Sequence, residues 1–209
     1  MAILQAGAST NLANVDANLN LQTVPGIPEH PAAGGWYSVA GQTSAVIAVS
    51  LGASVNLMSM RLAVASTRKA YVYRMRVLIS VATVGTSALV PGTLGLQRFT
   101  AQTPTGGTAR TPNEMFEAEA TATDMTDVRD SNAALTGTAP TWGNVVAVTT
   151  VPLFIANGAM WMEWIVEPPY PIVLAPGDGL GLRTQVAMPA TQTWMYSYNA
   201  YWLEGPTVV

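Results

Sequence analysis

Two segments of this chain alternate apolar and polar residues with a period of two, and this alternation constrains the fold more than any other feature. The segments are residues 71–83 and 194–202. Successive side chains of a β-strand point to opposite faces, so the pattern predicts strands with one buried face. The predicted buried faces are Tyr71, Tyr73, Met75, Val77, Ile79 and Val81 in the first strand, and Trp194, Tyr196, Tyr198, Ala200 and Trp202 in the second.

Shorter apolar runs separated by turn residues predict further strands. Residues 175–179 (Ala-Pro-Gly-Asp-Gly) are typical of a turn, and Asn157-Gly158 predicts a tight hairpin between the residues on either side of it. Many strands with few helical stretches predict an all-β, antiparallel sandwich of the jelly-roll type. The shorter candidate strands are residues 45–49, 55–64, 145–155, 160–166 and 180–188.

The chain of 209 residues fits a single domain with two additions. Residues 1–35 contain Pro25, Pro28 and Pro31 and predict an extended N-terminal arm, leaving a β-sandwich over residues 36–209. Residues 99–143 predict a long surface excursion between strands, and they hold six of the twelve acidic residues. Within that excursion, the capping signal Thr111-Pro112-Asn113-Glu114 predicts a short helix near residues 112–121.

Charged residues are scarce, at 10% of the chain, against roughly 25% in an ordinary soluble domain. Near-neutral surfaces associate, so the chain is expected to be buried either in a membrane or in an assembly. Every long uncharged stretch is interrupted by Gly, Pro, Ser, Thr or Asn, and none offers about twenty continuous apolar residues. The opening Met-Ala-Ile-Leu-Gln-Ala-Gly does not have the pattern of a signal peptide. Assembly is therefore the expectation, with no membrane partner.

Several chemistries are not expected from the residue inventory. Cysteine is absent, which excludes disulfides and thiolate metal sites. The formal net charge is −3 and no basic tract occurs, so no nucleic-acid partner is expected. His30, the one histidine, lies between prolines, away from any nucleophile motif, and a catalytic role is not expected for it. We expect no cofactor, no metal and no catalytic residue.

Two groups of carboxylates allow an alternative interpretation. Glu163 and Glu167 lie near Trp161, as in a sugar-cleaving site, but they also alternate with apolar residues as an outward polar face would. Surface ion pairing is the favoured interpretation. Asp124, Asp127 and Asp130 recur at every third residue, which does not match a calcium loop, and a solvated loop is favoured there.

Six Trp, seven Tyr and ten Met provide adaptable apolar contact area, and these residue types are enriched at protein interfaces. About half of them are expected to fill the core. Tryptophans near turns or chain ends are harder for one subunit to bury completely. The predicted interface residues are Leu12, Val15, Leu19, Leu21 and Ile27 in the arm, together with Trp36, Trp142 and Trp202.

Eight short motifs follow one another in a fixed order: residues 15–21 (VDANLNL), 98–101 (RFTA), 106–109 (GGTA), 125–129 (MTDVR), 134–137 (ALTG), 170–174 (YPIVL), 179–183 (GLGLR) and 198–204 (YNAYWLE). Together they resemble a family of structural proteins of tailed bacteriophages. The resemblance implies a virion protein, and several such proteins are jelly-roll decoration or cement proteins that sit as trimers or dimers on the capsid.

The sequence therefore predicts a non-enzymatic capsid decoration or cement protein. It would be made in the host cytoplasm and located in the virion, where it contacts the major capsid protein or another virion protein. A homo-oligomer is expected, with a trimer favoured. Two alternatives remain open: a receptor-binding module of a tail tip or fibre head, and a glycan depolymerase.

Overall fold

A computed structural model describes residues 35–44, 46–47, 51–83, 92–101, 103–115, 122–151, 160–188 and 193–206. Within these residues the chain forms strands and no helix, so the predicted all-β fold is confirmed. The strands assemble into antiparallel sheets that form a sandwich. No helix in this part of the chain is long and apolar enough to cross a membrane.

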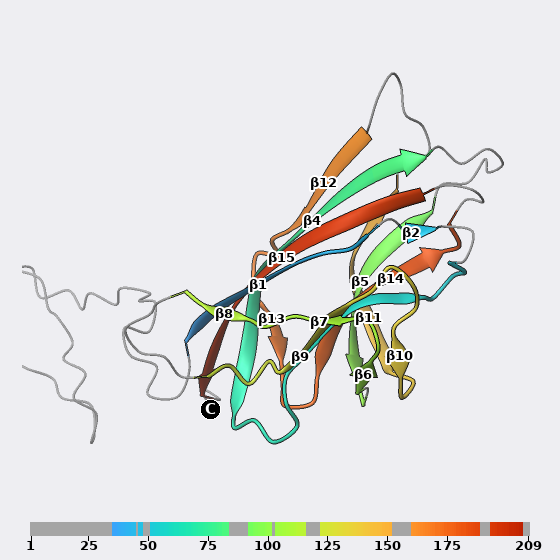
Figure 1. Ribbon diagram of the computed structural model, residues 1–209. Coiled ribbons are helices and arrows are strands. Elements are labelled where there is room, and N and C mark those ends of the chain that lie inside the picture. Colours follow the sequence, from blue (N-terminus) through green and yellow to red (C-terminus); the bar gives the residue numbers. More distant parts are fainter. Residues whose placement is uncertain are drawn as a thin grey trace, which may run out of the picture. The chain divides into compact units, whose positions relative to one another are not determined.

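The first sheet contains seven strands, and its main path runs in the order β12-β4-β15-β1-β8. Figure 1 shows β12, β4, β15 and β1 side by side as one layer. Two short strands lie off this path, since β13 pairs with β4 and β2 pairs with β15. The bounds are β1 Trp36–Gln42, β2 Val46–Ile47, β4 Arg68–Thr83, β8 Asn113–Glu114, β12 Met160–Val166, β13 Ile172–Leu174 and β15 Thr193–Pro206.

The second sheet contains six strands in the order β11-β5-β14-β3-β9-β7, and β10 pairs with β6 as a separate two-stranded ribbon. Every pairing of both sheets is antiparallel. The bounds are β3 Asn56–Arg61, β5 Thr93–Thr100, β6 Pro104–Thr105, β7 Thr108–Ala109, β9 Asp127–Asp130, β10 Thr136–Gly137, β11 Thr141–Thr150 and β14 Gly179–Val186.

The long strands follow the jelly-roll order. Strands β1, β15, β4 and β12 are neighbours in one sheet, and β3, β14, β5 and β11 are neighbours in the other. The chain passes from β3 to β4 to β5 and later from β13 to β14 to β15, changing sheet each time. This eight-strand arrangement of two facing sheets confirms the predicted jelly-roll sandwich.

The core lies between the inner faces of the two sheets. In β15 the predicted face is confirmed, because Trp194, Tyr196, Ala200 and Trp202 have no exposed surface and Tyr198 has 2%. The second sheet contributes a matching apolar set from its own strands, Leu57, Met58, Met60, Leu94, Leu96, Leu180 and Leu182.

The first predicted strand is correct only in part. From Met75 to Val81 its alternate residues are buried, as expected. The pairing with β15 shifts at Tyr73, because Tyr201 pairs with Arg74 and Trp202 pairs with Val72. One extra residue reverses the phase of the alternation, so Val72 faces the core and Tyr73 is 40% exposed. The prediction that Tyr71 and Tyr73 lie on the buried face is wrong, since Tyr71 is also partly exposed.

The excursion over residues 99–143 is not only a surface loop. It supplies β8, which extends the first sheet beyond β1, and β9, which extends the second sheet beyond β3. Met125 and Val128 belong to the core. The helix predicted near residues 112–121 is wrong where the structure describes it, because Asn113 and Glu114 pair with β1 as a strand. Residues 116–121 lie outside the described part, as does the hairpin predicted at Asn157-Gly158.

Candidate interaction surface

On one side of the sandwich, short strands cover the edges of both sheets. An open strand edge presents unpaired backbone groups and invites pairing with another chain. The edges of β1 and β3 are covered by β8 and β9, both from the excursion. The opposite ends of the sheets are β11 and β12, and within the described residues each pairs with a strand on one side only.

Strand β11 is the longer of these two edges and carries no charged side chain. Its residues are exposed or only partly buried throughout, so neither face is fully covered. Val148 is 55% exposed and Val145 is 42% exposed. Natural edge strands are commonly protected by charges or prolines, and β11 has neither.

The backbone of β11 shows which of its groups face outward. The N–H of Val151 donates to the carbonyl of Gly92, the residue before β5, at 2.8 Å. Hydrogen-bonded and non-hydrogen-bonded pairs alternate along an antiparallel ladder. Thr149 therefore bonds to β5, whereas Val148 and Thr150 direct their N–H and C=O groups to the open edge.

Two register irregularities, between Trp142 and Val145 and between Val145 and Ala147, divide β11 into two halves. The second half, from Ala147 to Thr150, pairs regularly with β5 and forms the open edge. The first half contains Trp142, and bulges of this kind redirect side chains.

Trp142 lies across the outer face of the second sheet. Its ring packs edge-on against Phe99, with 5.5 Å between ring centroids. The guanidinium carbon of Arg183 lies 4.3 Å from the ring centroid, which is a cation–π contact. Gly181 makes room for the ring, because a Cβ at that position would lie 2.9 Å from the indole. Arg183 is partly desolvated, and burial lowers the pKa of its guanidinium.

Two hollows flank Trp142. One has a volume of about 260 Å³ and is lined by residues that include Arg98, Thr100, Asn144 and Asp178. The other has a volume of about 240 Å³ and lies beside the segment that precedes β11. Nothing in the sequence pattern pointed to these hollows, although the glycines before Arg183 are a signal of close packing against an outer sheet face.

A buried ion-pair cluster fastens the excursion to the start of β4 and the end of β15. Arg68 contacts Asp124 at 2.6 Å and Glu204 at 3.3 Å. Glu204 has no exposed surface. Its carboxylate accepts hydrogen bonds from the Thr123 hydroxyl, from the backbone N–H of Asp124 at 2.8 Å and from the Trp202 indole at 3.0 Å. The Arg68 hydrogen bond lowers the pKa of the Asp124 carboxyl and raises the pKa of the Arg68 guanidinium.

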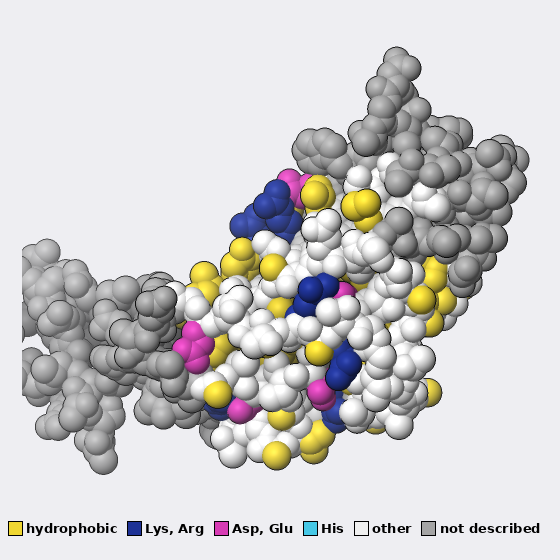
Figure 2. Space-filling model, in the orientation of Figure 1, with side chains coloured by type: hydrophobic (Ala, Val, Ile, Leu, Met, Phe, Trp, Pro, Cys, Tyr) yellow, Lys and Arg dark blue, Asp and Glu magenta, His cyan; other side chains and the backbone are white. Residues whose placement is uncertain are grey.

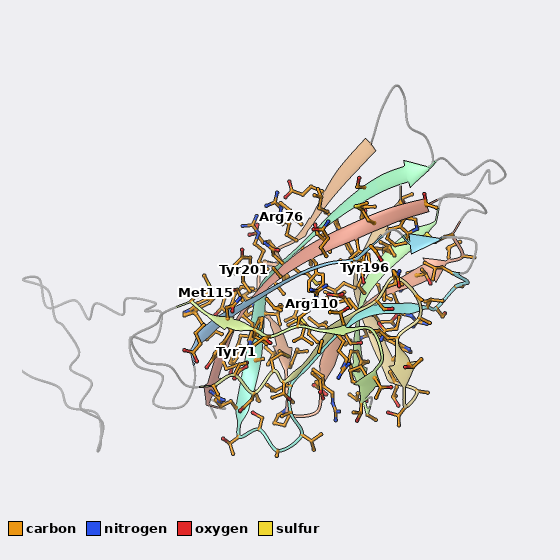
Figure 3. All side chains as sticks on the ribbon, viewed as in Figure 1. Tyr71, Arg76, Arg110, Met115, Tyr196 and Tyr201 are labelled. Atoms are coloured by element: carbon orange, nitrogen blue, oxygen red, sulfur yellow. The ribbon has the colours of Figure 1, made fainter. Side chains whose placement is uncertain are left out.

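A second cluster joins β9 to β15. Both oxygens of the Asp130 carboxylate accept hydrogen bonds from Arg110, at 2.6 and 3.0 Å. The Tyr198 hydroxyl donates to the same carboxylate at 3.1 Å. Burial and the Asp130 charge raise the pKa values of Tyr198 and Tyr196. Figure 3 shows Arg110 and Tyr196 in the central part of the molecule.

Both clusters correct the expectation of a solvated loop at the three aspartates. Asp130 is 1% exposed, and the oxygens of Asp124 are held by Arg68 and Ser66. Asp127 lies 3.8 Å from Arg61. Each carboxylate is paired with a different arginine, and the described residues contain no group of three or more ligands able to hold a metal ion. The sequence could not supply these pairings because the partners lie far apart along the chain.

The expected surface pairing of Glu163 and Glu167 is confirmed. Glu163 pairs with Arg76, and Glu167 lies 3.2 Å from Arg74. Arg76 lies on the outer side of β4, where it is labelled in Figure 3. Figure 2 shows blue and magenta side chains together near this part of the first sheet, whereas most of the remaining described surface in that view is uncharged.

The three predicted interface tryptophans of the described chain differ in exposure. Trp202 is fully buried beneath Tyr37, 5.9 Å away between ring centroids, so the expectation that one subunit would leave it partly exposed is wrong. It has no surface left for a neighbour. Trp36 is partly exposed and packs on Tyr73 at 5.0 Å, and Trp142 is also partly exposed. The other candidates lie outside the described residues: Leu12, Val15, Leu19, Leu21 and Ile27 of the arm, and His30.

Comparison with known proteins adds no assignment. No model of a protein family matches the chain, and neither a characterised protein nor a solved structure matches it.

Proposed function

We propose that this protein is a non-enzymatic structural component of a tailed-phage particle that works by packing against copies of itself and its neighbours. The observation that carries the proposal is the uncharged, open edge formed by β11. An edge with outward backbone donors and acceptors and exposed valines is suited to sheet-to-sheet contact with another subunit.

The charge distribution supports self-association. An uncharged surface loses no ion hydration when it is buried and meets no like charge on the surface that it contacts. Residues 131–162 contain no charged side chain, and they include all of β11. The contact between copies would therefore be apolar and main-chain in character, as in stable oligomers.

The capsid decoration role rests on the resemblance of the ordered motifs to phage structural proteins. The jelly roll is compatible with it, since viral capsid domains use this fold, but fold alone does not assign function. We propose a homo-oligomer, with three copies favoured, that contacts the major capsid protein or another virion protein.

The carboxylates favour this proposal over a glycan depolymerase. A glycosidase needs two carboxyl groups free to act on one bond. Glu163 and Glu167 each pair with an arginine on the outer face of the first sheet. Neither carboxylate is therefore free in the way that a glycosidase requires.

Sedimentation velocity of the full chain and of Val148→Lys tests the proposal. We expect an oligomer for the wild type and a shift to monomer for the variant, because the contact would bury the lysine ammonium without a partner charge. Val64→Lys is the matched control: Val64 is 67% exposed in the turn between β3 and β4, and its variant should remain oligomeric. A monomeric wild type, or a Val148→Lys oligomer as stable as the control, would contradict the proposal.

A further inference from the structure

Trp142 is held in one orientation while keeping part of its ring exposed. Phe99 and Arg183 contact it from two directions, and Gly181 leaves room beneath it. Arg183 is itself fixed, since its Nη1 donates to the Gln97 side chain at 2.9 Å. An aromatic ring that is already ordered binds a ligand without a further loss of side-chain entropy.

The hollows on either side of the ring have the size of small subsites. Their volumes are about 260 and 240 Å³, somewhat below the roughly 300 Å³ at which pockets for drug-sized ligands begin. Both are lined by Trp142. One ligand with a repeating unit could therefore occupy both hollows and pass over the ring between them.

The polar groups of the larger hollow carry no net charge. The Arg98 Nη2 and Asp178 Oδ2 atoms lie 3.8 Å apart, so their charges offset one another. Thr100, Thr141 and Asn144 add uncharged donors and acceptors, and all three are exposed to solvent. A phosphate or carboxylate ligand would gain little here, whereas hydroxyl groups would find partners in both hydrogen-bonding directions.

We propose that Trp142 and its two hollows bind a neutral oligosaccharide. A pyranose ring presents an apolar C–H face that packs on an aromatic ring and a rim of hydroxyls that suit Thr and Asn side chains. The site lies in the first half of β11 and includes Asn144 within the first irregularity, whereas the assembly edge lies after the second irregularity. Binding is therefore separate from the proposed self-association and does not depend on it.

Titration of the ¹⁵N-labelled full chain with maltohexaose and with chitohexaose tests this assignment by NMR. The indole N–H of Trp142, assigned by its loss in Trp142→Phe, should shift saturably with at least one of these sugars. The indole of Trp36, partly exposed on the other sheet, should not shift and serves as an internal control.

Two further variants separate binding from a structural role. Asn144→Ala should weaken the affinity about tenfold, which corresponds to about 1.4 kcal/mol. Asn199→Ala, the matched change on the outer face of the first sheet, should leave the affinity unchanged. Sedimentation of Trp142→Phe should match the wild type, because the assembly edge is intact.

Three results would overturn the assignment: no shift of the Trp142 indole with either sugar up to its solubility limit, equal affinity of Asn144→Ala and wild type, or equal affinity of Trp142→Phe and wild type. Failure of Trp142→Phe to assemble would instead place Trp142 in the subunit contact. None of these results changes the sedimentation outcome expected for Val148→Lys.

Discussion

Individual buried carboxylates hold the excursion to the sandwich. Glu204 is fully buried, and its carboxylate accepts hydrogen bonds from several donors. The Asp130 carboxylate accepts hydrogen bonds from two guanidinium nitrogens of Arg110. A buried charge is tolerated only when it is paired and hydrogen-bonded, and removing one partner leaves the other uncompensated. These residues therefore hold together segments that are distant in sequence.

Asp124 makes the stability supplied by its ion pair with Arg68 sensitive to acid. Its pKa is lowered from the ordinary value of 3.8, first by the Arg68 hydrogen bond and also by the Ser66 hydroxyl. A lowered folded-state pKa means that the stabilisation is fully present above the unfolded-state value near 4 and is lost as the pH falls through the folded-state value. Glu204 is a second carboxylate that contacts Arg68.

Asp124→Asn should accordingly lower the free energy of unfolding by about 1–3 kcal/mol at neutral pH, the usual range for a hydrogen bond to a charged group. The difference from wild type should begin to shrink below about pH 4, where the carboxyl of the unfolded chain takes up a proton. It should vanish once the pH falls below the lowered folded-state pKa of Asp124. Urea denaturation across pH 2–7, monitored by tryptophan fluorescence, measures it. Glu167→Gln, which breaks an exposed pair, is the control and should cost less than about 1 kcal/mol. A deficit of Asp124→Asn that stays constant down to pH 2 would exclude the ion pair as its cause.

At the scale of the element, the local pattern predicted strands well where pairing is regular. In β15 the alternation continues without interruption, and its predicted face is buried. In β4 the phase changes at Tyr73, because the extra residue depends on the partner strand. Val72 and Leu78 were both apolar exceptions on the predicted polar face, so the sequence did not mark where the phase changes. Trp202 illustrates the same limit: its closeness to the chain end suggested exposure, but Tyr37 from β1 covers it.

The excursion was predicted least well for a related physical reason. Its strands are two to four residues long, and each exists through its pairing with another strand: β8 with β1, β9 with β3, β7 with β9, and β6 with β10. A capping signal such as Thr111-Pro112-Asn113-Glu114 describes what a helix start would prefer, and tertiary pairing overrode it. The hollows beside Trp142 likewise depend on contacts among β5, β11 and β14 that the linear sequence does not display.

The close packing around Gly179 of β14 can be tested by substitution. A Cβ on Gly179 would lie 2.7 Å from the Met60 carbonyl oxygen and 2.4 Å from the Phe99 ring. Gly179→Ala should therefore lower the free energy of unfolding by about 1–3 kcal/mol, as overpacking does. Gly52→Ala is the control, because a Cβ there meets no atom within 4 Å. Equal stability of the two variants in urea denaturation would show that the strand can move to accommodate the methyl group.

At the scale of the whole molecule, the composition and the sheet topology both support the proposed self-association. The 10% charge content predicted a chain that assembles, and the jelly-roll topology leaves an uncharged strand at the end of the second sheet. The opposite edges are covered by the excursion, so among the described residues one side of the fold has covered sheet edges and the other has open ones. The resemblance to phage structural proteins supplies the proposed setting for that assembly.

The most direct measurement of the central claim is amide hydrogen exchange at the open edge of β11 as a function of protein concentration. If copies pair through this edge, the N–H groups of Val148 and Thr150 become hydrogen-bonded in the assembly and should be protected at high concentration. Their exchange should accelerate on dilution and should be fast at every concentration in Val148→Lys. The account predicts that Thr149, bonded to β5, stays protected throughout. Exchange of Val148 and Thr150 that is equally fast at all concentrations of the wild-type chain would contradict assembly through β11.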